Sequence, residues 1–202
     1  MKGHSLCLVV ALPAEAKPVI RALGLKRLQP DGAYPRYGRG AITLVLSGPG
    51  QLAAGKAVAW IASMSANSAT YWINLGIAGH ARLQPGEVVC ADRVIDTSTG
   101  EAWALEPLSG LPATRIGPLR CVVEAETRFA DVAAYDMESS AIARVLAGDS
   151  ALSRLQVLKI ISDNPANPSR GINAKMVAKL IEGALPTLET MIHCLLPHAE
   201  TR

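Results

Sequence analysis

Three apolar segments of strand length each lead directly into an acidic side chain. Residues 6–11 precede Glu15, residues 132–135 precede Glu138, and residues 155–161 precede Asp163. In α/β sheets, ligands bind just beyond the carboxyl ends of the strands. The sequence therefore predicts one site that is assembled from distant parts of the chain, with Glu15, Glu138 and Asp163 in it.

Strand-like segments alternate with helix-like segments along the chain. We expect strands at 6–12, 41–46, 71–75, 87–94, 119–123, 132–135 and 155–161, with 34–38 pairing as a hairpin. Helices are expected to follow Pro13 and to cover 52–64, 138–146 and 173–196, with Pro186 kinking or breaking the last one. Residues 97–118 are expected to be loop with short strands. This alternation predicts a single α/β domain over residues 1–202, with three layers and a largely parallel sheet.

Composition and charge exclude several classes of protein. The 202 residues carry 20 basic and 17 acidic side chains, a balance that argues against a nucleic-acid surface. The four cysteines form no CxxC pair and no zinc-ligand pattern, so we expect free thiols in a reducing compartment and no metal. The apolar run near the N-terminus is broken at Pro13, too early for a membrane span. We expect a soluble cytoplasmic protein without a membrane partner.

Six short motifs occur at the expected strand ends and turns. They are Ala11-Leu-Pro-Ala-Glu15, Ser47-Gly-Pro-Gly50, Asn74-Leu-Gly-Ile-Ala-Gly79, Pro85-Gly-Glu-Val-Val89, Asp136-Met-Glu-Ser-Ser-Ala141 and Ile161-Ser-Asp163. In this order the motifs resemble the nucleoside phosphorylase and nucleosidase superfamily, and are most similar to its methylthioadenosine/S-adenosylhomocysteine nucleosidase branch. The resemblance implies a mixed central sheet flanked by helices, cleavage of a purine–ribose bond, no cofactor, and a homo-oligomer that is a dimer or larger.

The resemblance also implies roles for the acidic side chains. Asp163 is similar to the acid that protonates the purine at N7, and Glu15 to the base that activates the attacking water. Glu138 corresponds to the carboxylate that holds the ribose 2′- and 3′-hydroxyls, and Met137 is expected to pack on the sugar. An Asp at position 163 favours a 6-amino purine by the same resemblance.

Further binding residues are expected from the same resemblance. Ala78 and Gly79 would lie along the nucleoside, and His80 follows them where a small residue is common. Phe129, the one Phe in the chain, is assigned to stacking on the base. The turn that contains Ser47 and Gly48 is a further candidate for contact with the substrate.

The expected chemistry fits these residue types without reference to a family. Cleavage of an N-glycosidic bond leaves negative charge on the departing base, and a nearby acid removes that charge by protonating the base. Burial at an apolar strand end would raise the pKa of Asp163, so that the acid keeps its proton near neutral pH. An ionised Glu138 can accept hydrogen bonds from two vicinal hydroxyls and stabilise positive charge on the sugar. No metal is required.

Water is favoured over phosphate as the nucleophile. Phosphorylases carry cationic groups at the positions of the 12–15 loop and of Asn74, whereas this chain has an acid and an amide there. Arg36 or Arg39 from a neighbouring subunit, or the 47–50 turn at a helix start, could still hold an anion. A phosphate-dependent phosphorylase therefore stays an alternative. So does a non-catalytic nucleoside-binding module, because the stretch 97–134 is shorter than is usual in this family.

Each candidate residue also has a purely structural interpretation. Asp163 could cap a turn, Glu15 could stabilise a helix dipole, and Glu138 could be a solvated residue in the first turn of a helix. His80 could be an incidental loop residue. The three Trp residues, at positions 60, 72 and 103, are expected in the core or at a subunit interface.

Overall fold

The computed structural model describes residues 4–29, 32–64, 69–124, 129 and 132–197 of the chain. The strands are β1 (Ser5–Val10), β2 (Lys26–Arg27), β3 (Arg36–Arg39), β4 (Ile42–Leu46), β5 (Thr70–His80), β6 (Val88–Asp96), β7 (Ala102–Ala104), β8 (Thr114–Cys121), β9 (Ala134–Asp136) and β10 (Leu155–Asp163). The helices are α1 (Pro13–Ala22), α2 (Gln51–Met64), α3 (Ser139–Gly148) and α4 (Ala174–Leu195), with short 3-10 turns η1 (Leu152–Arg154) and η2 (Ser169–Gly171).

The strands form one mixed sheet in which β5 occupies the central place. β5 pairs in parallel with β1 on one side and with β10 on the other. Near its carboxyl end β5 also pairs antiparallel with β9, at Gly79 and His80. The order β10-β6-β8-β9-β5-β1-β4-β3-β2 brings strands from both halves of the sequence to β5. The carboxyl ends of β1, β5 and β10 therefore lie at the same edge of the sheet.

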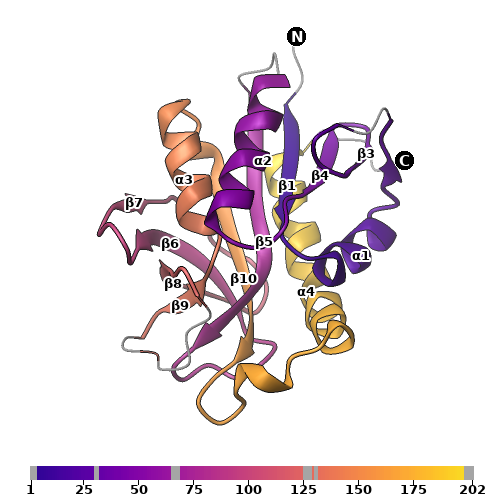
Figure 1. Cartoon of the computed structure of the whole chain (residues 1–202). Helices are drawn as coiled ribbons and strands as arrows, with labels where there is room; N and C mark the ends of the chain where they lie inside the picture. The colour runs from indigo at the N-terminus through magenta and orange to yellow at the C-terminus, as the bar shows by residue number, and fades with distance from the viewer. Residues whose placement is uncertain (1–3, 30–31, 65–68, 125–128, 130–131, 198–202) are drawn as a thin grey trace.

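Helices cover both faces of the sheet and give the molecule three layers (Figure 1). On one face α1 and α4 pack on alternate residues of the central strands, among them Leu8, Leu75 and Leu158. On the other face α2 and α3 pack on the intervening residues, among them Val9, Trp72 and Val157. These side chains are almost fully buried because successive residues of a strand point to opposite faces and both faces are covered. The predicted three-layer α/β architecture is confirmed.

Several elements differ from the expectation, among them β5, β8 and α4. β5 continues to His80, where the sequence suggested an end at Leu75, and β8 begins at Thr114 within the stretch expected to be mostly loop. β8 accommodates Pro118, which has no N–H to donate, because the register between β6 and β8 shifts next to it, between Ala91 and Arg93. Pro186 lies inside α4 without ending it.

None of the described helices is long and apolar enough to cross a bilayer.

Candidate active site

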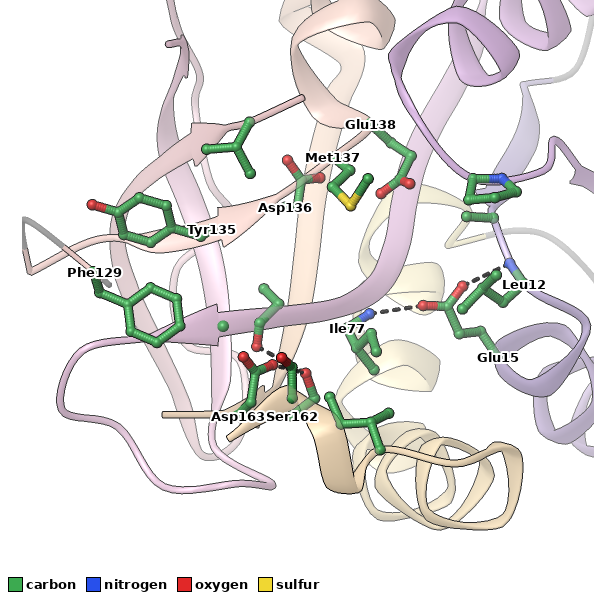
Figure 2. Close-up of a pocket in the computed structure, with 17 residues that line it drawn as sticks. Leu12, Glu15, Ile77, Phe129, Tyr135, Asp136, Met137, Glu138, Ser162 and Asp163 are labelled. Atoms are coloured by element: carbon green, nitrogen blue, oxygen red, sulfur yellow. Dashed lines mark hydrogen bonds between the residues drawn. The ribbon is translucent and has the colours of Figure 1, made fainter. Parts of the chain in front are cut away.

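A cavity of about 170 Å³ opens at the carboxyl edge of the sheet. This volume is below the ~300–1,000 Å³ of pockets for drug-sized ligands, so the cavity suits a small molecule. Its lining comes from the ends of β1, β5, β9 and β10, from the 47–50 turn and from the segment around η2 (Figure 2). Glu15, Glu138 and Asp163 all line it, although they lie far apart in the sequence. The three acids thus meet at one cavity.

Glu15 lies in the first turn of α1 and is only 2% exposed. The Leu12 N–H donates to its Oε2 at 2.9 Å, and the Ile77 N–H of β5 donates to its Oε1 at 2.9 Å (Figure 2). Burial raises the pKa of Glu15, and these two backbone hydrogen bonds and the Lys159 ammonium oppose the rise. The carboxyl group is therefore held rigidly between β1 and β5, in a site where it can exchange a proton.

Glu138 immediately precedes α3 and is mostly buried. Its Oε1 accepts a hydrogen bond of 2.8 Å from the N–H of Gly50, which has a φ of 89° and precedes α2. Burial raises the pKa of Glu138 and the nearby Asp136 raises it further, while Lys159 and the Gly50 N–H lower it. The 47–50 turn therefore fixes the orientation of the Glu138 carboxylate through the Gly50 N–H.

Asp163 is the last residue of β10, and its direction is set by an irregularity in the sheet. Ile161 pairs with Ala78 and Asp163 pairs with Gly79, so Ser162 is an extra residue between them. A bulge of this kind turns the side chains that follow it, and bulges are common next to active sites. The Ser162 hydroxyl donates to Asp163 Oδ1 at 2.6 Å. Burial raises the pKa of Asp163, which is 8% exposed, and the Ser162 hydrogen bond opposes the rise.

Lys159 is a functional candidate that the sequence reasoning missed. It lies inside β10, is 1% exposed, and its Nζ is 2.8 Å from Asp136 Oδ2. Burial would lower the pKa of Lys159, but Asp136, Glu138 and Glu15 together outweigh burial, and the pKa is raised. Lys159 therefore carries a positive charge beneath the acids. A lysine between the apolar residues Leu158 and Ile160 was the available signal, because a buried lysine needs an acidic partner.

Small residues bring the lining of the cavity close to the backbone of β5. A methyl group on Gly79 would lie 2.6 Å from two ring carbons of Phe129 and 3.0 Å from Asp163 Oδ2. The Phe129 ring also packs at an angle on Tyr135, with the centroids 5.2 Å apart. Ala78, Gly79, Phe129 and Met137 all line the cavity, as the sequence suggested. The bare Gly79 backbone, the Phe129 ring and the Asp163 carboxyl thus border the same space.

Three predicted contact residues lie outside the lining of the cavity. The Ser47 hydroxyl donates to Gly48 O at 2.8 Å, and this turn reaches the cavity through Pro49 and acts on Glu138 through Gly50. His80 points away, because its Nδ1 accepts hydrogen bonds from backbone N–H groups of the loop that follows. Contact of Ser47, Gly48 or His80 with a substrate therefore stays a prediction.

The arginines considered for phosphate are engaged elsewhere in this chain. The Arg36 guanidinium lies over the Trp60 ring, 5.2 Å from its centroid, and Arg39 donates to Leu23 O. Among the described residues that line the cavity, the acidic side chains are Glu15, Asp136, Glu138 and Asp163, and none of these lining residues is a Lys, Arg or His. The cavity can therefore donate and accept protons and bind hydroxyl groups, and its charge disfavours an anion.

Comparison with known proteins identifies the fold of this chain. No protein-family model matches the chain, and no curated protein matches it in sequence. The apo structure of 5′-methylthioadenosine nucleosidase from Arabidopsis thaliana is similar, with a TM-score of 0.82 at 18% identity over 96% of this chain and 97% of that one. The chain has the nucleosidase fold.

Two structures from Helicobacter pylori extend the likeness. The 5′-methylthioadenosine/S-adenosylhomocysteine nucleosidase with butyl-thio-DADMe-Immucillin-A has a TM-score of 0.75 at 15% identity, over 95% of this chain and 99% of that one. Futalosine hydrolase has a TM-score of 0.75 at 16% identity, over 94% of this chain and 97% of that one. Because proteins with different substrates share the nucleosidase fold, the fold leaves the substrate of this chain open.

Proposed function

We propose that the protein is a purine nucleosidase that hydrolyses the N-glycosidic bond of an adenosine-type nucleoside such as methylthioadenosine. The observation that carries the proposal is the meeting of Glu15, Glu138 and Asp163 at one cavity, with the pKa of each carboxyl group raised by burial. Perturbed pKa values cluster at functional sites. The nucleosidase fold supports the same reaction.

The reaction assigns one role to each acid. Asp163 gives its proton to the purine as the bond between the purine and the anomeric carbon breaks, so that the bonding electrons leave on a neutral base. Water forms the new bond to the anomeric carbon and passes a proton to Glu15. Glu138 binds the ribose hydroxyls and stabilises positive charge on the sugar. The products are the free base and a ribose derivative; solvent then returns a proton to Asp163 and takes up the proton that Glu15 accepted.

Lining residues support a nucleoside in this orientation. The Phe129 ring lies against Gly79 and beside Asp163, where a planar base could pack on it and reach the acid. Met137 lies between Phe129 and Glu138 in the lining and offers an apolar contact to the sugar (Figure 2). The remaining lining is largely apolar, with Leu12 and Ile172 among its members. These groups favour an uncharged purine nucleoside over a nucleotide.

Water is the proposed nucleophile because the carboxyl groups of the cavity would repel phosphate. The deciding experiment incubates a panel of purine nucleosides with and without phosphate and measures the free base by chromatography. Release of adenine in phosphate-free buffer is expected. Strict dependence on phosphate would establish the phosphorolytic alternative, and binding of nucleosides without release of any base would establish a non-catalytic binding module.

We further propose that the protein works in the cytoplasm as a homo-oligomer. Cys7, Cys90 and Cys121 are buried free thiols, which suits a reducing compartment. The oligomer is an implication of the resemblance to nucleosidases, and sedimentation velocity tests it. A single monomeric species at working concentration would contradict that part of the proposal.

A further inference from the structure

We infer that His80 and Asn164, which lie outside the lining of the cavity, form a clamp that positions Asp163, and this inference rests on the proposed function. Each of the two residues directly follows a residue of the site. His80 follows Gly79 at the end of β5, and Asn164 follows Asp163 at the end of β10. Gly79 and Asp163 pair with each other across the sheet. A link between His80 and Asn164 therefore fixes the two strand ends that carry the proposed acid and its neighbour.

The link runs through the peptide groups of Leu83. The imidazole Nδ1 of His80 accepts hydrogen bonds of 2.9 Å from both the Arg82 and the Leu83 N–H groups. The Asn164 side-chain amide donates to Leu83 O at 2.8 Å. Leu83 is thus held at its N–H by the last residue of β5 and at its carbonyl by the residue after β10. His80 must have its proton on Nε2, because Nδ1 faces two donors.

Asn164 also fixes the turn that leaves β10. Its Oδ1 accepts hydrogen bonds from the Ala166 N–H, the Asn167 N–H and the Asn167 side-chain amide, at 2.8–3.1 Å. The backbones of Asn164 and Asn167 exchange two further hydrogen bonds of 3.0 Å. Asn164 is 3% exposed, and both ends of its buried amide have partners. A buried and fully paired amide holds the backbone next to Asp163 in one conformation.

Neither His80 nor Asn164 lines the cavity, so they act through Asp163. An acid that protonates a base must keep its position closely, since a displacement of about 1 Å can lower the rate ~10²-fold. The clamp also keeps Asp163 buried, and burial is the main reason that its pKa is raised. Loosening the clamp should admit water to Asp163 and lower that pKa towards the ordinary value. The alkaline limit of kcat, set by loss of the Asp163 proton, would then move to lower pH.

Matched variants separate this positioning role from a role in stability alone. His80→Leu and Asn164→Ala remove the clamp, whereas His80→Asn keeps an acceptor near the place of Nδ1. Asn167→Ala is the control, because it removes one hydrogen bond to Asn164 and leaves the Leu83 link intact. We expect His80→Leu and Asn164→Ala to lower kcat ~10- to 100-fold with KM changed less than about threefold. The alkaline limit of kcat should fall in both, while His80→Asn and Asn167→Ala stay close to the wild type.

A double variant gives a second test of the clamp. Because both residues act through Leu83, His80→Leu combined with Asn164→Ala should lower kcat little more than either change alone. Folded variants with wild-type kcat and pH dependence would overturn the inference, and so would a loss confined to KM or multiplicative losses in the double variant.

A direct titration of Asp163 distinguishes failure of the clamp from failure of the proposed function. Carbon-13 NMR of the carboxyl groups, assigned with Asp163→Asn, gives the pKa of Asp163 in the wild type and in Asn164→Ala, which also serves if His80→Leu does not fold. A lower pKa in Asn164→Ala supports the clamp even if the wild type releases no base. An unchanged pKa would overturn the clamp and leave the proposed nucleosidase activity to its own assay.

Discussion

At the scale of single residues, the buried acid Asp163 makes the stability of the folded protein depend on pH. Burial raises the pKa of Asp163 above its ordinary value of 3.8, so the folded protein holds this proton more tightly than the unfolded chain does. The stabilisation from the bound proton is complete below about pH 3.8 and is lost as the pH rises through the folded-state pKa. If the buried carboxyl group of Asp163 ionises at neutral pH, the free energy of unfolding is therefore lower than it is with the proton bound.

Asp163→Asn should relieve this penalty. Asparagine does not ionise, so we expect the variant to gain stability relative to the wild type as the pH rises, by about 1.4 kcal/mol for each unit of the raised pKa. Urea unfolding of both proteins at about pH 4 and about pH 8 measures the difference. A difference in the free energy of unfolding that does not change with pH would show that Asp163 titrates normally.

Gly79 tests whether the cavity depends on the close approach of Phe129 and Asp163 to the backbone. In Gly79→Ala the new methyl group would overlap the Phe129 ring and press on Asp163. We expect kcat/KM to fall by more than ~10-fold, with a loss of stability of about 1–3 kcal/mol. Gly148→Ala is the control: its methyl group meets nothing within 4 Å, and alanine in a helix adds about 0.5–1 kcal/mol. Equal kcat/KM in the two variants would contradict this account of Gly79.

At the scale of elements, the sequence predicted β1, α1, α2 and β10 closely because each combines a strong apolar pattern with clear boundaries. β5 was expected to stop at Leu75, because Gly76 and Gly79 resemble turn residues. The structure gives another reason for these glycines: a side chain on Gly76 would meet Glu15, and one on Gly79 would meet Phe129. Tertiary contacts that no local pattern reports therefore set the length of β5.

The candidate site, like the fold, was predictable only in part from the sequence. Strand-end acids were visible in the sequence, because parallel strands bring their carboxyl ends to one edge of a sheet. The partner of Lys159 was not visible, because it depends on how β9 and α3 meet β10. The partners of His80 were not visible for a similar reason, since they lie in a loop whose path the sequence does not fix.

Lys159 joins β10 to the segment that carries Glu138, so its removal should destabilise several elements together. In Lys159→Met the carboxylates of Asp136 and Glu138 lose a buried cation, and we expect a loss of about 3–5 kcal/mol in the free energy of unfolding. Adding Asp136→Asn to Lys159→Met should recover part of the loss, because it removes one unpaired charge. Chemical unfolding of the single and double variants measures both effects. Wild-type stability of Lys159→Met would show that the ion pair is dispensable.

At the scale of the whole molecule, the mixed sheet brings Glu15 together with Glu138 and Asp163, which lie more than a hundred residues further along the chain. Glu15 follows β1, Glu138 follows β9 and Asp163 ends β10, and each of these strands is a sheet neighbour of β5. The site therefore exists only in the complete fold, and its chemistry is a property of the assembled sheet edge. The nucleosidase fold found in proteins that are 15–18% identical to this chain agrees with this arrangement.

The most direct test of the account measures adenine release from methylthioadenosine in phosphate-free buffer. The wild type is compared with Glu15→Gln, Glu138→Gln and Asp163→Asn, each checked for folding by circular dichroism. We expect turnover by the wild type and a loss of ~10²–10⁴-fold in kcat for Asp163→Asn, as for the removal of a general acid. Smaller but clear losses are expected for the two glutamates. Wild-type rates in all three variants would contradict the claim that these carboxyl groups act on one glycosidic bond.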